Sequence, residues 1–184
     1  MIVVGGQAKD VGKTMLVCNV IATFAELRWT AVKISDHQHD VSGCKLVAEG
    51  SGWRILEQVT RDQDSDTGRY LGAGATRALL VQADENAIGE AAAALPPFVS
   101  GNLIVESNRA VEFLSPALFL LVVDAESDFK PSARAQLERA DGLVWRGTRA
   151  PAIDKPRFPA VENCLDSRLA SLIRDRISRA QVDD

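Results

Sequence analysis

The sequence predicts a single three-layer α/β/α domain, in which helices cover both faces of a mostly parallel sheet of about six or seven strands. Three observations support this prediction. An apolar run, a glycine-led turn and a helical pattern follow one another within the first 28 residues, and a second apolar run comes directly afterwards. Similar apolar runs alternate with helical patterns further along the chain. The run at 118–123 is continuously apolar, as is typical of a central parallel strand.

The bulk composition is that of an ordinary globular protein. The 184 residues are 46% hydrophobic and 25% charged, which suits one domain spanning 1–184 with a full core. The net charge of −4 and the lack of a basic block argue against a nucleic-acid surface. No apolar run approaches the roughly 18 residues of a membrane span, and no leader pattern opens the sequence. We therefore expect a cytoplasmic protein that binds neither nucleic acid nor membranes.

The turn between the first apolar run, at 2–4, and the first helix carries the clearest motif of the chain. In a phosphate-binding loop (P-loop), glycines let successive backbone N–H groups face one point, and the helix N-terminus adds partial positive charge there. Lys13 would reach the β- and γ-phosphates, and the Thr14 hydroxyl would bind Mg²⁺. We expect the phosphates of GTP or ATP to be bound by Gly6, Gln7, Ala8, Lys9, Asp10, Val11, Gly12, Lys13 and Thr14.

The spacing of this loop departs from the common pattern, which has its first glycine four residues before Gly-Lys. Gln7 stands at that position, and Gly6 lies one residue earlier. A Gly-x5-Gly-Lys-Thr loop with Val11 before its second glycine resembles the loop of dethiobiotin synthetases. Partition ATPases carry a lysine where this chain has Ala8, so that subclass is disfavoured. The alternative is an ordinary turn between a strand and a helix, with Lys13 and Thr14 at its surface.

The helical pattern after the loop continues to position 28, and a second strand is expected at 30–34. Strand, helix and strand in this order form a βαβ unit, which implies a parallel sheet. The polar segment 35–52 then leaves the carboxyl end of that strand, where open α/β sheets bind ligands. Three interpretations stay open for it: a metal site of His37, His39 and Cys44, a surface loop, or a loop that contacts a ligand.

The remaining elements follow from local patterns. Weak alternation predicts a strand at 55–60, and Thr67 can cap a short helix before a strand at 77–81. An alanine-rich helix is expected at 84–95, stopped by two prolines, and then a strand at 102–108. After the central strand at 118–123 we expect a helix ending near position 140, a last short strand at 143–145 and an amphipathic closing helix at 165–177.

Several short motifs are similar to those of the molybdopterin-guanine dinucleotide biosynthesis adapter (the B protein) family. They are the run that begins at Lys33 and ends at Asp40, the Asp66-Thr67-x-Arg69 element, and the Ala-Gly-Ala at 73–75. The resemblance implies binding of a purine nucleotide, GTP above all, with Mg²⁺, and weak or partner-dependent hydrolysis. It also implies a role in molybdenum cofactor biosynthesis through a partner protein, and a homodimer is compatible with it.

Acidic side chains complete the expected site. Glu106 ends an apolar strand, which suits a carboxylate held near Mg²⁺ directly or through water. We expect Thr14, Asp66 and Glu106 to bind the metal, and Lys13 and Glu106 to act in catalysis. Contacts to the nucleotide or a second ligand are assigned to Lys33, Asp36, His37 and Arg69.

Three functions therefore compete. A nucleotide-binding adapter with weak hydrolase activity leads. An ATP-dependent carboligase of dethiobiotin-synthetase type is second, and a non-hydrolysing regulatory P-loop protein is third. The guanine-reading Asn-Lys-x-Asp motif of GTPases does not occur at 146–149, so the sequence does not choose between guanine and adenine.

Overall fold

A computed structural model describes residues 1–36, 41–124, 126, 129, 131–148 and 150–180. Within them, nine strands form one sheet in the order β3-β4-β5-β2-β6-β1-β7-β8-β9. The main elements are β1 (Ile2–Gly6), α1 (Lys13–Thr23), β2 (Trp29–Ser35), β3 (Cys44–Gly50), β4 (Trp53–Gln58), α2 (Asp66–Gly72), β5 (Arg77–Ala83), α3 (Ile88–Ala93), β6 (Asn102–Glu106), β7 (Leu118–Asp124), α4 (Pro131–Leu137), β8 (Gly142–Arg146), β9 (Arg157–Pro159) and α5 (Ser167–Ala180).

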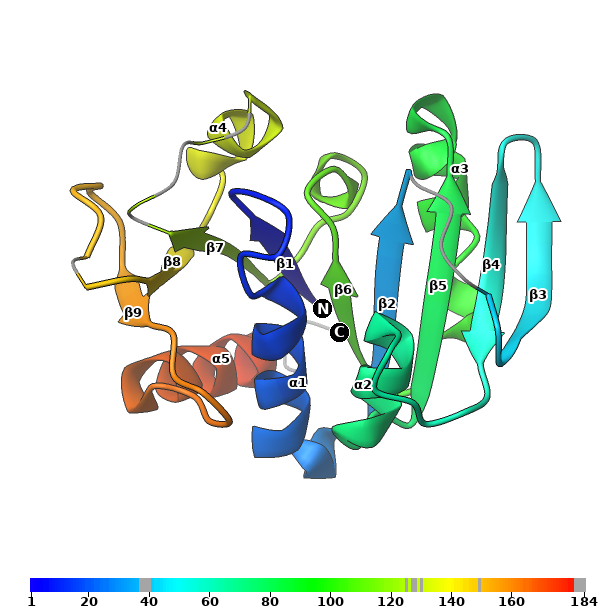
Figure 1. The fold of residues 1–184 in the computed structure, drawn as a ribbon, viewed down its shortest axis with the longest axis horizontal. Helices are drawn as coiled ribbons and strands as arrows, with labels where there is room; N and C mark the ends of the chain where they lie inside the picture. Colours follow the sequence, from blue (N-terminus) through cyan, green and yellow to red (C-terminus); the bar gives the residue numbers. More distant parts are fainter. Residues whose placement is uncertain (37–40, 125, 127–128, 130, 149, 181–184) are drawn as a thin grey trace.

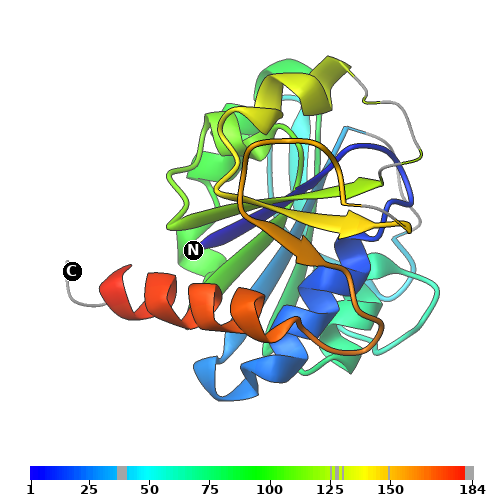
Figure 2. The same ribbon diagram turned by 90° about the vertical axis from the view of Figure 1, so that its left-hand side faces the viewer.

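The sheet is covered on both faces, as Figures 1 and 2 show. On one face α1, α2 and α5 bury Val17, Tyr70 and Ile173 against strand residues such as Val4. On the other face α3 and α4 pack against the opposite side of the same strands, where Val3 is wholly buried. The central strands are apolar on both sides for this reason. The predicted three-layer α/β arrangement is therefore confirmed.

The predicted sheet of six or seven strands is too small, because β3 and β9 were missed. β3 lies inside the segment 35–52 that the sequence indicated as a polar loop, and it pairs antiparallel with β4. β4 also runs antiparallel to β5, so the sheet is mixed, although its other pairings are parallel. Both missed strands lie at the edges of the sheet. Edge strands are half solvated, so they need not show the apolar pattern by which strands are found.

One predicted helix cap is also wrong. Helix α2 is capped by Ser65, whose side chain accepts a hydrogen bond from the backbone N–H of Gly68 at 3.0 Å. Thr67 is buried instead, and its hydroxyl donates to the side-chain oxygen of Gln58 at 2.8 Å. The Thr67 hydroxyl is bound to the buried side chain of Gln58, and the Ser65 hydroxyl, two positions earlier, caps the helix.

Parallel pairing brings the functional segments to one edge of the sheet. β1 lies between β6 and β7, and β2 lies on the other side of β6. The register aligns Val4 with Glu106 and Lys33 with Glu106. The carboxyl ends of β1, β6 and β2 therefore meet beside the start of α1, where open α/β sheets bind ligands.

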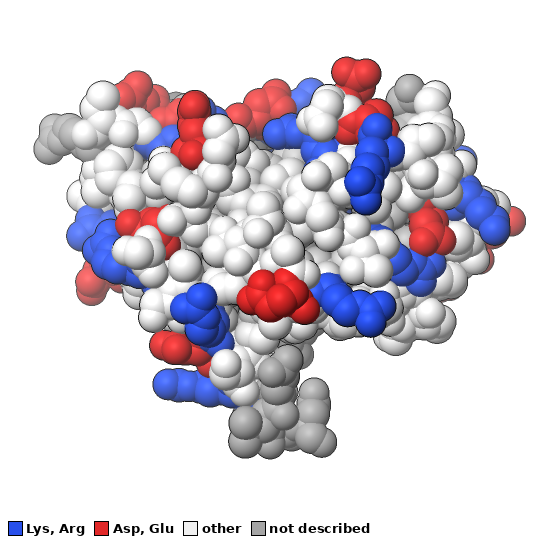
Figure 3. All heavy atoms as spheres, turned by 90° about the horizontal axis from the view of Figure 1, so that it is seen from below, with Lys and Arg blue, Asp and Glu red and all other residues white. Residues whose placement is uncertain are grey.

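Charged side chains of both signs are scattered over the face shown in Figure 3, which is the molecule seen from below. Among the described residues, none of the helices is both long enough and apolar enough to cross a membrane.

Candidate functional site

The loop between β1 and α1 needs glycine at two positions. Helix α1 begins at Lys13, and its N-cap Gly12 has φ of 107°, a value that side-chain-bearing residues rarely adopt. At Gly6 the constraint is space, because an added Cβ would lie 2.7 Å from Cγ and Cδ of Lys13 and from Cγ1 of Val11. The lysine stem thus lies directly across Gly6. Although this glycine comes one position earlier than in the common pattern, it still lets the Lys13 side chain approach the backbone of the loop closely.

Two amide side chains anchor the base of this loop. The Gly6 N–H donates to Oδ1 of Asn108 at 2.6 Å, and Nδ2 of Asn108 donates back to the Gly6 carbonyl at 2.8 Å. Gln7 is fully buried, and its Oε1 accepts a hydrogen bond from the backbone N–H of Asp124 at 2.7 Å. Gln7 and Asn108 therefore connect the loop to β7 and to the end of β6. The Gln7 side chain is engaged with β7, whereas the sequence predicted a contact between Gln7 and the nucleotide.

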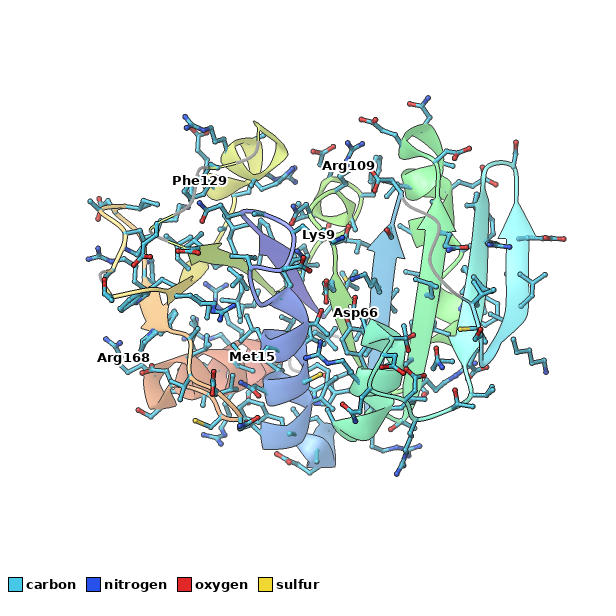
Figure 4. All side chains as sticks on the ribbon, in the orientation of Figure 1. Lys9, Met15, Asp66, Arg109, Phe129 and Arg168 are labelled. Atoms are coloured by element: carbon cyan, nitrogen blue, oxygen red, sulfur yellow. The ribbon has the colours of Figure 1, made fainter. Side chains whose placement is uncertain are left out.

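Four polar side chains from four elements converge beside the loop. The Thr14 hydroxyl lies 2.9 Å from Oδ1 of Asp66 and 2.9 Å from Oε2 of Glu106. Lys33 forms ion pairs with the same two carboxylates, contacting Oδ2 of Asp66 and, at 3.2 Å, Oε1 of Glu106. Figure 4 shows Asp66 at the start of α2, beside the N-terminal part of α1. The structure thus brings together Thr14, Asp66 and Glu106, the three residues predicted to bind Mg²⁺.

The single Thr14 hydroxyl lies between two carboxylates. Thr14 has one hydroxyl proton but lies at hydrogen-bonding distance from two carboxylate oxygens. One of the two contacts is therefore between oxygen lone pairs, and the nearby Lys33 ammonium group offsets their repulsion. Three oxygens in this arrangement are the ligands that a hard cation such as Mg²⁺ prefers.

The two site lysines have different electrostatic surroundings. Burial lowers the pKa of Lys13, and the nearby Lys33 lowers it further, while Glu106 opposes both. Burial acts in the same sense on Lys33, but the charges and hydrogen bonds of Glu106 and Asp66 outweigh it and raise its pKa. Within the described part of the chain, the Lys13 ammonium donates to the Ala8 carbonyl, at 3.1 Å. Lys13 is thus the site cation with the weaker internal partner.

Tyr70 is a part of the site that sequence reasoning missed. It is fully buried, and its hydroxyl donates to Oε2 of Glu106 at 2.5 Å. Burial and the Glu106 charge raise the pKa of Tyr70 well above its ordinary value, so it stays a donor. The spacing of Asp66 and Tyr70, four positions apart on one helix face, was the available signal.

The other predicted site residues lie around this cluster or away from it. Arg69 follows Asp66 on α2, and its guanidinium lies 3.9 Å from Oδ1 of Asp66. Lys9 and Asp10 are exposed at the tip of the loop, and Val11 is buried beneath it. Asp36 is exposed just beyond β2 and lines a separate cavity of about 290 Å³ with Trp53, Arg54 and Asp84, among others.

The metal interpretation of 35–52 depends on two histidines beyond the part of the chain that the structure describes. His37 and His39 lie outside the described residues, as does Asp40. Cys44 is described, and its thiol lies 3.1 Å from Oε1 of Gln58. No group of three or more His, Cys, Asp and Glu side chains within the described ranges could hold a metal ion.

A cavity of about 160 Å³ opens next to the loop, on the side away from Asp66. It lies at the ends of β8 and β9 and beside the first turn of α1, and its lining is Met15, Trp145, Arg146, Gly147, Pro159, Ala160 and Glu162. Arg146 reaches toward the loop, since a Cβ on Gly12 would lie 3.3 Å from its Cδ. This cavity was not predicted from the sequence.

The thiol of Cys18, one turn along α1 from Thr14, gives a test of the electrostatics behind the cluster. Burial is the main cause that raises its pKa from 9.0 to about 11, and the charges of Glu106 and Asp66 add to the effect while Arg69 opposes it. A pKa two units higher leaves about 100-fold less thiolate at pH 8. We expect iodoacetamide to modify Cys18 far more slowly than the exposed Cys164, as measured by peptide mass spectrometry. Equal rates in the folded protein, with equal rates after unfolding as the control, would contradict this environment.

The fold and the loop together define the class of this protein: an α/β protein with a nine-stranded, mostly parallel sheet and a glycine-led loop at the start of its first helix. Its fold is similar to that of LpxK from Aquifex aeolicus, solved in its "apo" form in complex with ATP. The two structures superpose with a TM-score of 0.53 at 19% identity, over 86% of this chain and 52% of LpxK. This chain therefore spans about half the length of that protein, and at this identity the similarity establishes the fold alone.

No family model and no curated protein matches the sequence.

Proposed function

We propose that this protein binds a purine nucleoside triphosphate, GTP or ATP, together with Mg²⁺. The observation that carries the proposal is the meeting of Lys13 and Thr14, at the start of α1, with the carboxylates of Asp66 and Glu106. A helix N-terminus preceded by a glycine-led loop supplies backbone N–H groups and partial positive charge for phosphates. The ATP bound by LpxK, whose fold is similar, supports a nucleotide as the ligand.

Each residue of the site has a role in this proposal. Lys13 leaves its carbonyl partner and binds the terminal phosphates, as a charge-assisted contact. Thr14, Asp66 and Glu106 supply oxygen ligands that fit Mg²⁺, which would neutralise phosphate charge when bound. Glu106, held by Tyr70, also orients the water or hydroxyl that attacks the terminal phosphate.

The cavity next to Met15 and Arg146 is the place for the base and sugar. Met15 of its lining is two residues from Lys13, and Arg146 of its lining reaches Gly12, so a nucleotide held by its phosphates at Lys13 could extend into it. Glu162 offers an acceptor and Arg146 a planar cation, which can stack on either purine. This lining supports a purine and leaves guanine and adenine as the two candidates.

A role similar to that of the molybdopterin-guanine dinucleotide adapter is the finer form of this proposal. It rests on the sequence motifs at 33–40 and 66–75 and on the placement of Lys33, Asp66 and Arg69 in one site. In this form hydrolysis is weak and increases with a partner protein of cofactor biosynthesis. The loop spacing supports a carboligase of dethiobiotin-synthetase type as the second candidate. Turnover of ATP that depends on a diaminated fatty-acid substrate would favour the carboligase.

Direct binding tests the proposal. Isothermal titration calorimetry of the purified protein with GTP and with ATP, each with and without Mg²⁺, measures whether and which nucleotide binds. Mass spectrometry of the small molecules released on denaturation identifies any nucleotide that co-purifies. Micromolar binding of one purine triphosphate, dependent on Mg²⁺, is the expected result. No binding of either at millimolar concentration contradicts the proposal.

Glu106→Gln separates the metal from the phosphate contacts. The amide keeps the shape of Glu106 but loses its charge, so it is a poorer ligand for Mg²⁺. We expect the affinity for the nucleotide with Mg²⁺ to fall about ten-fold and the affinity without Mg²⁺ to change little. Titrations of the variant under both conditions measure the two effects. An equal loss under both would make Glu106 a structural residue.

A further inference from the structure

We infer that Lys33 excludes divalent cations from the site until a nucleotide binds, because its ammonium group holds the two carboxylates that would bind the metal. The inference rests on the proposed function and adds a condition to it: the metal enters only with the nucleotide. It also gives Lys33 a role different from the one predicted from the sequence, where Lys33 was expected to contact the nucleotide or a second ligand.

Lys33 and Thr14 contact different oxygens of the same two carboxylates, those of Asp66 and Glu106. Lys33 contacts Oδ2 of Asp66 and Oε1 of Glu106, whereas Thr14 contacts Oδ1 and Oε2 of the same groups. Each carboxylate oxygen of the pair therefore lies against a polar group of this chain, although the single Thr14 proton is donated to only one of Oδ1 and Oε2. Tyr70 adds a second donor at Oε2 of Glu106. A cation that takes these oxygens as ligands has to displace the ammonium.

The backbone holds Lys33 beside Glu106. Lys33 and Glu106 are register partners on the adjacent parallel strands β2 and β6, so their Cα atoms stay together while the sheet is intact. The Lys33 side chain is only 17% exposed and that of Glu106 only 3%. In such a site the attraction between opposite charges is screened far less than at the surface. The Lys33 ammonium group therefore stays beside the two carboxylates while the sheet is intact.

The positive and negative charges of the site balance before any ligand binds. The two carboxylates of Asp66 and Glu106 are matched by the two ammonium groups of Lys13 and Lys33, and the Arg69 guanidinium adds positive charge beside Asp66. A divalent cation added alone would therefore meet a cluster whose negative charge is already compensated. A nucleoside triphosphate brings several negative charges, which can accept both lysines and free the carboxylates for the metal. The flexible stem of Lys33 allows this change of partner within the same site.

Metal binding in the absence of nucleotide tests the inference directly. Lys33→Met removes the charge and keeps most of the side-chain volume, and Lys45→Met makes the same change on the exposed strand β3. We expect Lys33→Met to bind Mn²⁺, measured by electron paramagnetic resonance, and Mg²⁺, measured by calorimetry, at least about ten-fold more tightly than the wild type. Lys45→Met should match the wild type. With nucleotide present, the difference between Lys33→Met and the wild type should shrink.

A second variant covers the case in which Lys33→Met folds poorly, since it leaves two carboxylates without their cation. Lys33→Gln keeps a hydrogen-bond donor, and thermal unfolding with and without Mg²⁺ then gives the readout. Stabilisation by Mg²⁺ alone in Lys33→Gln, but not in the wild type, supports the inference. A folded Lys33→Met or Lys33→Gln protein that binds metal alone no more tightly than the wild type overturns it.

The metal-only measurement is independent of the proposed function. If the wild type binds nucleotide and the Lys33 variants gain no affinity for metal, the inference fails while the proposed function stands. If the variants gain affinity for metal but neither they nor the wild type bind nucleotide, the proposed function fails instead.

Discussion

Lys13→Ala is expected to abolish nucleotide binding, with a loss of affinity of at least about 100-fold, and to leave the fold intact. The ammonium group would make charge-assisted hydrogen bonds to the phosphates, and such bonds contribute about 1.5–3 kcal/mol each. In the protein alone its direct partner among the described atoms is the Ala8 carbonyl, so little structure depends on it. Titration with nucleotide and Mg²⁺ measures the affinity, and chemical denaturation measures the free energy of unfolding.

The matched control for this variant is Lys45→Ala, which removes an exposed lysine from the edge strand β3. Four strands, β4, β5, β2 and β6, separate β3 from β1. It should bind nucleotide like the wild type. A folded Lys13→Ala variant that binds nucleotide with unchanged affinity would show that the loop is an ordinary turn between a strand and a helix.

Glu106→Ala is expected to have the largest effect on stability, about 3–5 kcal/mol. Glu106 is 2% exposed and accepts hydrogen bonds or ion pairs from Lys33, Thr14 and Tyr70. Removing its carboxylate leaves the buried Tyr70 hydroxyl without its acceptor and weakens the pairing of the Lys33 charge. Urea denaturation of the variant and the wild type measures the difference in the free energy of unfolding.

An ion pair more open to solvent than Glu106 provides the control for Glu106→Ala. Glu57 is paired with Arg77 by two hydrogen bonds, of 2.7 and 2.8 Å, but its side chain is 26% exposed. Exposed pairs contribute about 0–1 kcal/mol, so Glu57→Ala should cost much less than Glu106→Ala. If the two variants lose equal stability, then burial of the Glu106 cluster is not what makes it important.

The loop and the central strands could be predicted because their signals are local. The glycines, Lys13 and Thr14 lie close together in the chain, and unbroken apolar runs mark strands that are buried on both faces. Glu106 was predicted as a site residue because it ends an apolar strand, and Asp66 because it lies in a motif similar to one of the adapter family. The parallel register between β2 and β6 then places Glu106 beside Lys33, and it is visible only in the folded sheet.

The rest of the site depends on contacts between residues far apart in the chain. Asn108 is 102 positions from Gly6, so their contact leaves no local pattern. Tyr70 is 36 positions from Glu106, and its spacing from Asp66 was the one local signal that linked it to the site. Strand β3 was missed because it is an edge strand that carries Lys45 and Glu49 among its exposed residues. In each case the structure is decided by what the residue meets in the folded chain, and a single sequence does not encode that in its spacing.

The pair of hydrogen bonds between Asn108 and Gly6 has a thermodynamic consequence for ligand binding. Fixing the backbone of one residue costs about 1–2 kcal/mol in conformational entropy. In this protein the entrance of the loop is already ordered by the Asn108 amide before any phosphate arrives. Binding of the proposed nucleotide would therefore not bear the entropic cost of ordering Gly6, and the free energy gained from phosphate contacts would be available as affinity. Lys9 and Asp10 form the exposed tip of the loop, away from this anchor.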